Sequence, residues 1–163
     1  MQPSIYISNI ILSNFRSHEK FTINSNSKNI VLFGKNGVGK TNILESISLL
    51  SPGRGLRNAK NEEIINKNTN TDYGLSANLQ FDNNSIKIKK TYLRDETKKS
   101  NLFIDDEKSK TADLLNYLRV IWVTPVMEKI MLQSNSERRN FFARLIFNIE
   151  KKHLKAFTAY NKF

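Results

Sequence analysis

Gly34-Lys35-Asn36-Gly37-Val38-Gly39-Lys40-Thr41 is the segment that decides the fold of this chain. It satisfies the phosphate-loop pattern G-x-x-x-x-G-K-[ST], in which a glycine-rich backbone forms a nest of N–H groups around a polyphosphate. An apolar run at 29–33 precedes the loop, and residues 42–50 follow it with Ile43, Ile47 and Leu50 on one helical stripe. We therefore expect a strand over 29–33, then the loop, then a helix.

The residues of this loop have separate expected roles. Gly34, Gly37 and Gly39 allow backbone conformations that are closed to other residues, so the main chain can approach the phosphates closely. Lys40 is placed to reach the β- and γ-phosphates, and the Thr41 hydroxyl can ligate Mg²⁺. The pattern thus predicts a nucleotide that carries a polyphosphate, with Mg²⁺ beside it and Thr41 as the metal ligand. That this nucleotide is ATP is implied by the family resemblance given below. The cofactor-binding residues are expected to be Gly34, Lys35, Asn36, Gly37, Val38, Gly39, Lys40 and Thr41.

The composition limits the class of protein. With 163 residues, 39% hydrophobic and 25% charged, the chain is long enough for one domain with a core, which we expect to span 1–163. The absence of cysteine excludes disulfides and thiolate zinc sites. No signal-peptide pattern or apolar run of membrane-spanning length is present, so we expect a cytoplasmic protein without membrane association.

The formal net charge of +11 is compatible with nucleic-acid binding, because lysine and arginine gain affinity for phosphates by releasing counterions. The chain is also rich in Lys, Asn and Ile, a bias that AT-rich coding sequence produces without any binding function. Lys87, Lys89, Lys90, Lys98 and Lys99 alternate with or flank strand residues, so a solvated sheet face explains them as well as a DNA footprint does.

The hydrophobic periodicity predicts a mixed α/β fold. Before the loop we expect a strand at 5–12, a polar connection at 13–20 and a short returning strand at 21–23. After its helix, a stop signal at 51–55 and a polar stretch at 58–72 lead to an antiparallel block of about 73–104. The expected strands of that block are 73–81, 85–93 and 101–104, with hairpin-turn chemistry at 82–84.

The rest of the chain is expected to be helical around one more strand at 120–123, with a helix at 112–118 before it and a helical segment of about 125–163 after it. Ser134 and Glu137 form a capping box at the start of a long amphipathic helix. Its expected core-facing side carries Phe141, Phe142, Leu145, Ile146 and Ile149.

Several segments together resemble the RecF recombination and repair ATPases. They are LSNFRSH at 12–18, the loop with its helix, SPGRGLR at 51–57, and WVTP at 122–125 leading to SERR at 136–139, all in the family's order. The resemblance implies the N-terminal lobe of an ABC-type ATPase head related to the SMC proteins. It also implies ATP-dependent homodimerisation on single-stranded or gapped DNA, cooperation with RecO and RecR in recombinase loading, and a part in the SOS response.

The same resemblance assigns roles to individual residues. Arg16, in Asn-Phe-Arg, is expected to lie beside the nucleotide. Arg54, Arg57, Arg138 and Arg139 are candidate contacts to DNA or to a second protomer. His18 and His153 have no partner residues that suggest catalysis, and we interpret both as surface or packing histidines.

Motifs that an ABC-type head needs for hydrolysis are not found in the sequence: a serine-glycine signature, an apolar strand ending in two acids, and a histidine switch. The pair Asp105-Asp106 is interpreted as a turn. Thr124 follows the strand expected at 120–123, where the family has a glutamine, which puts the metal-sensing position in doubt. We therefore expect an incomplete head with no catalytic residues, unable to hydrolyse ATP alone.

Two alternatives remain at this level. One is a DNA-binding or regulatory module that does not depend on ATP. The other is a phosphate-loop small-molecule kinase, against which the antiparallel block and the Asn-Phe-Arg segment argue.

Overall fold

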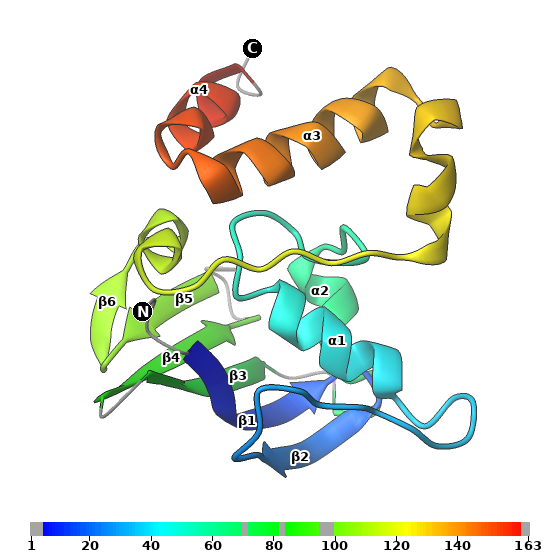
Figure 1. The fold of residues 1–163 in the computed structure, drawn as a ribbon. Coiled ribbons are helices and arrows are strands. Elements are labelled where there is room, and N and C mark those ends of the chain that lie inside the picture. The colour runs from blue at the N-terminus through cyan, green and yellow to red at the C-terminus, as the bar shows by residue number, and fades with distance from the viewer. Residues whose placement is uncertain (1–4, 70–71, 82–83, 95–99, 161–163) are drawn as a thin grey trace.

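The computed structural model describes residues 5–69, 72–81, 84–94 and 100–160, and its base is one six-stranded antiparallel sheet (Figure 1). The order is β2-β1-β3-β4-β5-β6. Because β1 pairs with both β2 and β3, the N-terminal hairpin and the middle block form a single sheet. The strands are β1 Ile5–Phe15, β2 His18–Asn24, β3 Tyr73–Phe81, β4 Asn84–Tyr92, β5 Ser100–Ile104 and β6 Glu107–Ser109.

The helices lie on one side of this sheet in two layers. In Figure 1, α1 and α2 cover the sheet, the extended segment 117–124 passes above them, and α3 and α4 lie beyond it. The predicted mixed α/β class is thereby confirmed. The helices are α1 Lys40–Ser48, α2 Asn61–Ile64, the 3₁₀ helices η1 Thr111–Asn116 and η2 Pro125–Leu132, α3 Asn135–Ile149 and α4 Lys152–Tyr160.

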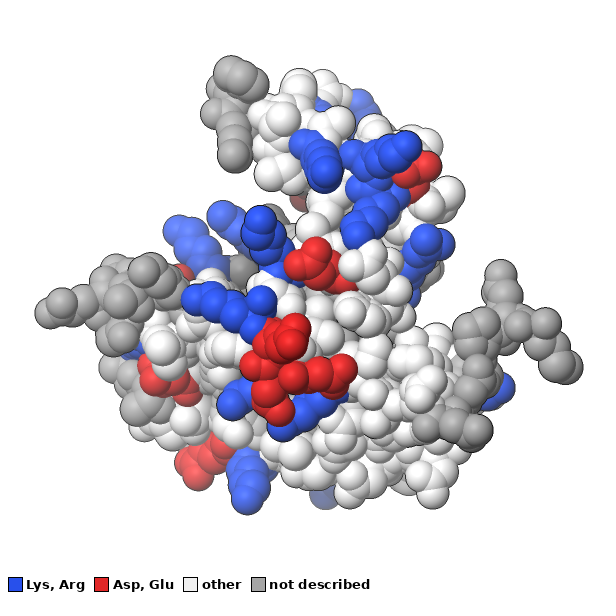
Figure 2. All heavy atoms as spheres, turned by 90° about the vertical axis from the view of Figure 1, so that its left-hand side faces the viewer, with Lys and Arg blue, Asp and Glu red and all other residues white. Residues whose placement is uncertain are grey.

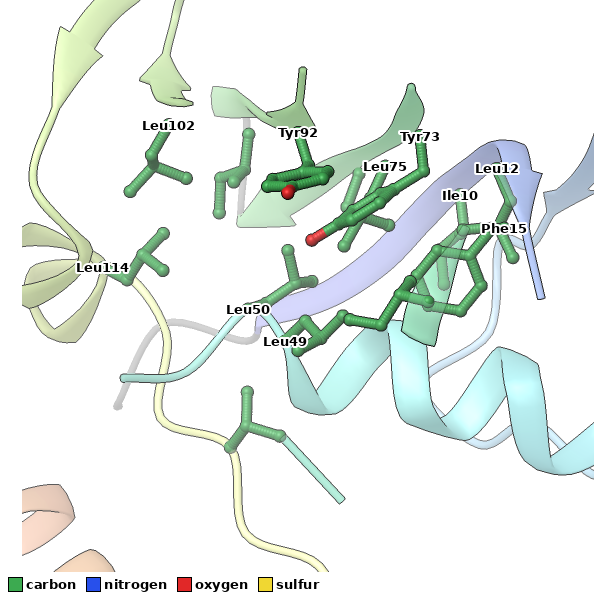
Figure 3. Close-up of a cluster of buried hydrophobic side chains, with 14 of the residues drawn as sticks. Ile10, Leu12, Phe15, Leu49, Leu50, Tyr73, Leu75, Tyr92, Leu102 and Leu114 are labelled. Atoms are coloured by element: carbon green, nitrogen blue, oxygen red, sulfur yellow. The ribbon is translucent and has the colours of Figure 1, made fainter. Parts of the chain in front are cut away.

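The core lies between the sheet and α1. Alternate residues of β3 point into it, as the strand period of two requires. The rings of Tyr73 and Tyr92 stack at 5.8 Å, and Phe15 meets Tyr73 edge-on at 5.7 Å. Figure 3 shows these rings projecting from the sheet toward Leu49 and Leu50, which follow α1 directly. The packing therefore fixes the helix that follows the phosphate loop.

Strands at 29–33 and 120–123 were predicted wrongly, because both segments are irregular. Val31 and Phe33 are 83% and 91% exposed, and Val123 is also largely exposed. An extended apolar run becomes a strand only when a neighbour completes its ladder of hydrogen bonds. Within the described ranges neither run has such a neighbour.

The predicted polar connection at 13–20 is also wrong. β1 continues to Phe15, whose side chain is buried, and β2 begins at His18, so Arg16 and Ser17 form a two-residue turn. Arg16 has φ +55°, a left-handed conformation that is unfavourable for a non-glycine residue. Its backbone N–H donates to the carbonyl of Ile64 at 2.7 Å, which holds the turn in place.

The middle strands agree with prediction to within a residue or two, and 82 and 83 of the predicted turn lie outside the described residues. Asp105 and Asp106 form a turn with φ +50° and +64°, which confirms that interpretation. The turn leads into β6, a strand that was not predicted. The helix expected at 112–118 is the shorter 3₁₀ helix η1.

The capping box of α3 is confirmed: Ser134 Oγ accepts from the Glu137 N–H at 3.3 Å, and the Glu137 carboxylate accepts from the Ser134 N–H at 3.1 Å. The predicted core-facing side is wrong in part. Ala143 and Phe147 are buried, whereas Phe142, Ile146 and Ile149 are exposed. The helix also ends at Ile149, because Glu150 takes an extended conformation before α4.

Candidate functional site

The phosphate loop has the backbone that its glycines predict. Gly34, Gly37 and Gly39 have φ of +142°, +85° and +98°, and Gly39 is the N-cap of α1. A left-handed glycine directly before a helix turns successive N–H groups toward one point, which is the geometry of an anion nest. The loop side chains between these glycines are exposed, so the concave backbone is accessible.

Lys40 and Thr41 occupy the first two positions of α1. Lys40 Nζ donates to the carbonyls of Gly34 and Lys35, both at 2.7 Å, so the ammonium group lies inside the curve of the loop. The Thr41 side chain is exposed on the first turn. Together these groups fit a magnesium-bound triphosphate. The N–H nest, the N-terminus of α1 and the Lys40 ammonium group suit the phosphates, and the Thr41 hydroxyl suits the metal ion. The part of the chain that is described contains no group of three or more His, Cys, Asp or Glu side chains able to hold a metal.

The β1–β2 turn contacts the start of α1. Asn42 Nδ2 donates to Ser17 Oγ at 2.9 Å, and His18 Nε2 lies 3.4 Å from the Gly39 carbonyl. A methyl group on Gly39 would overlap the His18 ring. His18 is therefore a packing residue, as interpreted, but it packs on the phosphate loop itself. Sequence patterns do not reveal this contact between residues 18 and 39.

Arg16 reaches from the same turn to Glu45 on α1. Its Nε lies 2.9 Å from Glu45 Oε2, and its Nη2 lies 2.6 Å from Oε1, which is a bidentate ion pair. The Glu45 side chain is fully buried, and that of Arg16 is 20% exposed. Arg16 Nη1 also donates to the Glu63 carbonyl at 2.5 Å. The guanidinium thus lies beside the second turn of α1, and its contact with nucleotide stays a prediction.

Arg57 binds the same carboxylate from the segment after α1. Its Nη1 lies 2.7 Å from Glu45 Oε2 and 2.9 Å from Asn42 Oδ1. Glu45 therefore joins two arginines that are far apart in the sequence to the phosphate-loop helix. Sequence reasoning missed Glu45, because an acidic residue on the side of the helix opposite the apolar stripe gives no sign of burial.

The other predicted DNA contacts have different surroundings. Arg138 donates to the Met131 carbonyl at 2.9 Å and to Asn135, so it fastens η2 to α3. Arg139 donates to Tyr160 Oη at 2.7 Å and lies over its ring, which fastens α3 to α4. Arg54 is exposed and lines a pocket near the end of α1. The interpretation of His153 as a surface or packing residue is compatible with its half-buried position on α4.

On the face that Figure 2 shows, the basic side chains do not form one continuous surface. They lie in separate clusters that acidic and uncharged side chains interrupt. Lys87 and Lys89 are exposed, as a solvated face predicts, but Lys90 is buried, which contradicts that reading for this residue. Lys98 and Lys99 lie outside the described residues. Within the described ranges, none of the helices combines the length and the apolar character that membrane crossing needs.

Comparison with known proteins gives a consistent result. The family described as RecF/RecN/SMC N terminal domain matches residues 6–157. The chain is 35% identical over 155 residues to the DNA replication and repair protein RecF of Rhizobium rhizogenes, covering 94% of this chain and 41% of the relative. It is 32% identical over 163 residues to RecF of Rickettsia bellii, covering 98% and 44%. The chain thus spans less than half the length of these relatives.

Solved structures match in the same way. The structure of the recombination mediator protein RecF-ATP in the RecFOR pathway superposes with a TM-score of 0.85 at 26% identity, covering 98% of this chain and 44% of that chain. An SMC head bound to the C-winged helix domain of ScpA gives a TM-score of 0.58 at 19% identity, covering 94% of this chain and 54% of that chain. At this identity the likeness shows only a shared fold. With the RecF-ATP match, it confirms the predicted N-terminal part of an ABC-type head.

Proposed function

The chain belongs to the RecF/RecN/SMC N-terminal domain family, and on this premise we propose that it binds ATP and Mg²⁺ as part of a RecF-type DNA replication and repair protein. The observation that carries the proposal is the phosphate loop, whose three glycines have positive φ, which ends at Gly39 directly before α1, and which holds Lys40 Nζ inside its curve. The family assignment argues against the small-molecule kinase alternative.

Binding would use the residues of the loop in the way their positions allow. The backbone N–H groups of the loop and of the first turn of α1 would donate to phosphate oxygens. Lys40 Nζ would exchange its two carbonyl contacts for the β- and γ-phosphates, which are stronger acceptors because they are charged. The Thr41 hydroxyl would contribute one oxygen ligand to Mg²⁺, whose chemistry is to neutralise charge on the phosphates.

Arg16 would act beside the same site. The ion pair with Glu45 fixes its guanidinium against α1, and the left-handed backbone of Arg16 is retained at an energetic cost. Residues in such conformations cluster at functional sites, which supports the expectation that this turn approaches the nucleotide.

For the larger protein we propose the activity that the resemblance to the RecF ATPases implies. It would bind single-stranded or gapped DNA as an ATP-dependent homodimer, load recombinase with RecO- and RecR-type mediators, and support the SOS response in the cytoplasm. The +11 charge supports the DNA part. Among the four predicted arginine contacts Arg54 fits best, because the other three are engaged within the fold. The proposal for this chain is limited to binding and does not extend to turnover.

The proposal is tested by fluorescence anisotropy of a labelled gapped duplex with the purified chain, with and without Mg·ATP. We expect ATP to tighten DNA binding in the wild type and in the exposed-lysine control Lys20→Ala, but not in Lys40→Ala. Salt-dependent DNA binding that is identical in all three, with and without ATP, would instead support the ATP-independent module.

A further inference from the structure

Lys90 occupies a position where the sheet calls for an apolar residue. Residues 86, 88, 90 and 92 of β4 all face the core, and Lys90 is flanked in register by Leu75 and Leu102. Lys90 is only 8% exposed, and its Nζ donates to the Leu49 carbonyl at 3.3 Å. Across the described residues, no carboxylate lies within ion-pair distance of it. Burial lowers the pKa of Lys90 to about 8.

A buried ammonium group without a carboxylate is costly, so its retention calls for a partner or a task. Lys90 lies in the wall of a pocket of about 280 Å³. A water molecule takes ~30 Å³ of liquid volume, so the pocket has room for a polyatomic ion with several waters. The lysine is therefore not sealed in the core but faces a space that a ligand can enter.

The other polar groups of the pocket favour an anion. Arg54 and Lys60 add two exposed cations, and Ser100 and Thr111 add hydroxyls. Glu62 is the one carboxylate among the described lining residues, and its Oε1 accepts a hydrogen bond from Tyr92 Oη at 2.9 Å. Donors thus approach the space from the sheet, from the loop after α1 and from the start of α2.

This site is separate from the phosphate loop. Lys40 begins α1, whereas Leu49, which accepts from Lys90, follows its last residue. A helix of nine residues is roughly 13 Å long, so the two sites lie at opposite ends of it. A single ligand phosphate cannot occupy both.

We propose that the pocket lined by Lys90, Arg54 and Lys60 binds a phosphate group. Three cations and two hydroxyls suit the several oxygens of a phosphate, and Arg54 can offer its donors in pairs. The phosphate can come from DNA or from a free phosphate compound. The DNA source rests on the proposed function, whereas the phosphate chemistry of the pocket does not.

The decisive test uses inorganic phosphate in a Lys40→Ala background, which removes the phosphate loop's own lysine. Melting temperatures are compared in sodium phosphate and in sodium chloride of matched ionic strength, since a ligand that binds only the native state raises the melting temperature. Lys90→Met is added to this background, and Lys89→Met is the matched control, because it removes the neighbouring lysine on the exposed face of the same strand.

We expect the phosphate-specific rise in melting temperature in the Lys40→Ala protein and in its Lys89→Met variant, and its loss in the Lys90→Met variant. Equal rises in all three would overturn the proposal. Because neither Lys40 nor DNA takes part, this result stands whether or not the proposed ATP and DNA binding is correct.

A second arm identifies the source of the phosphate in the otherwise wild-type chain, by anisotropy of the labelled gapped duplex. A roughly tenfold loss of DNA affinity in Lys90→Met that Lys89→Met does not share would assign the pocket to a DNA phosphate. Unchanged DNA affinity, together with the lost response to inorganic phosphate, would assign it to a free phosphate compound.

Discussion

Arg16 and Glu45 form a bidentate ion pair, with distances of 2.9 and 2.6 Å, across the junction between the β1–β2 turn and the phosphate-loop helix. The carboxylate is fully buried and also accepts from Arg57 at 2.7 Å. Two segments that flank the loop in the sequence are thus joined to α1 through one side chain. The position of the loop relative to the sheet depends on this carboxylate.

Glu45→Gln is expected to destabilise the fold. The amide keeps the shape but leaves two arginines without their negative partner, and breaking a buried ion pair costs roughly 3 kcal/mol. Urea unfolding measures the change, with Glu19→Gln on the exposed face of β2 as the control. If the two variants were equally stable, the buried ion pair would have no structural role.

Gly39→Ala is expected to destabilise the loop more than Gly53→Ala does. Both glycines have positive φ, at +98° and +108°, so either alanine strains the backbone by about 1–2 kcal/mol. Only at Gly39 does the added methyl group also meet His18, while the space around Gly53 is open. Thermal unfolding of the two variants compares them, and adding His18→Ala to Gly39→Ala should recover part of the loss. Equal losses at the two glycines would show that His18 does not pack on the loop.

Lys90→Met is expected to stabilise the protein at neutral pH. The lowering of the Lys90 pKa from 10.5 to about 8 corresponds to roughly 3 kcal/mol of unfavourable burial of the charge, which the substitution removes. The substitution also removes the hydrogen bond to the Leu49 carbonyl, which costs about 1 kcal/mol. Urea unfolding should therefore show a gain of about 2 kcal/mol over the wild type, which Lys89→Met does not show.

The same pKa sets a pH dependence. Between pH 8 and 10.5 the unfolded chain holds more protons at Lys90 than the folded chain does, so this group makes the free energy of unfolding rise with pH. Its unfavourable contribution is complete below pH 8 and absent above 10.5. The advantage of Lys90→Met over the wild type should therefore shrink through this window. An advantage that stays constant would mean that Lys90 has an ordinary pKa.

Arg139→Ala is expected to loosen α4. Its contacts with Tyr160 join α3 to α4, and an exposed cation–π contact contributes about 0.5–1 kcal/mol. Hydrogen exchange of the amides in 152–160 should become roughly threefold faster, whereas Lys155→Ala on the exposed side of α4 should leave it unchanged. Unaltered exchange in Arg139→Ala would leave this arginine free for the DNA contact that its sequence context predicts.

Local patterns predicted the parts of the fold that depend on local physics. The conformation of the phosphate loop was predicted from its glycines, and β3 and β4 were predicted from the alternation of apolar and polar residues. These elements could be predicted because the contacts that form them are made by residues close to them in the sequence. The run at 29–33 was predicted wrongly because a strand also needs a partner, which periodicity does not reveal. The burial of Lys90 could have been predicted, since it lies on the same side of β4 as Ile86, Ile88 and Tyr92. The neighbouring lysines instead favoured the interpretation of a solvated sheet face.

The site shows the same division. Lys40 and Thr41 were identified because the motif fixes their place relative to the loop. The partners of Arg16 were not, because Glu45 and Arg57 meet it only after the hairpin folds over α1. Contacts between segments this far apart have no signature in a single sequence.

The measurement that tests the central claim most directly is calorimetric titration of Mg·ATP into the purified chain, into Lys40→Ala and into Lys28→Ala, which removes an exposed lysine outside the loop. We predict saturable binding with one site in the wild type and in Lys28→Ala, and an affinity at least about tenfold weaker in Lys40→Ala. Binding of the same strength in all three proteins would contradict the assignment of residues 34–41 as the nucleotide site.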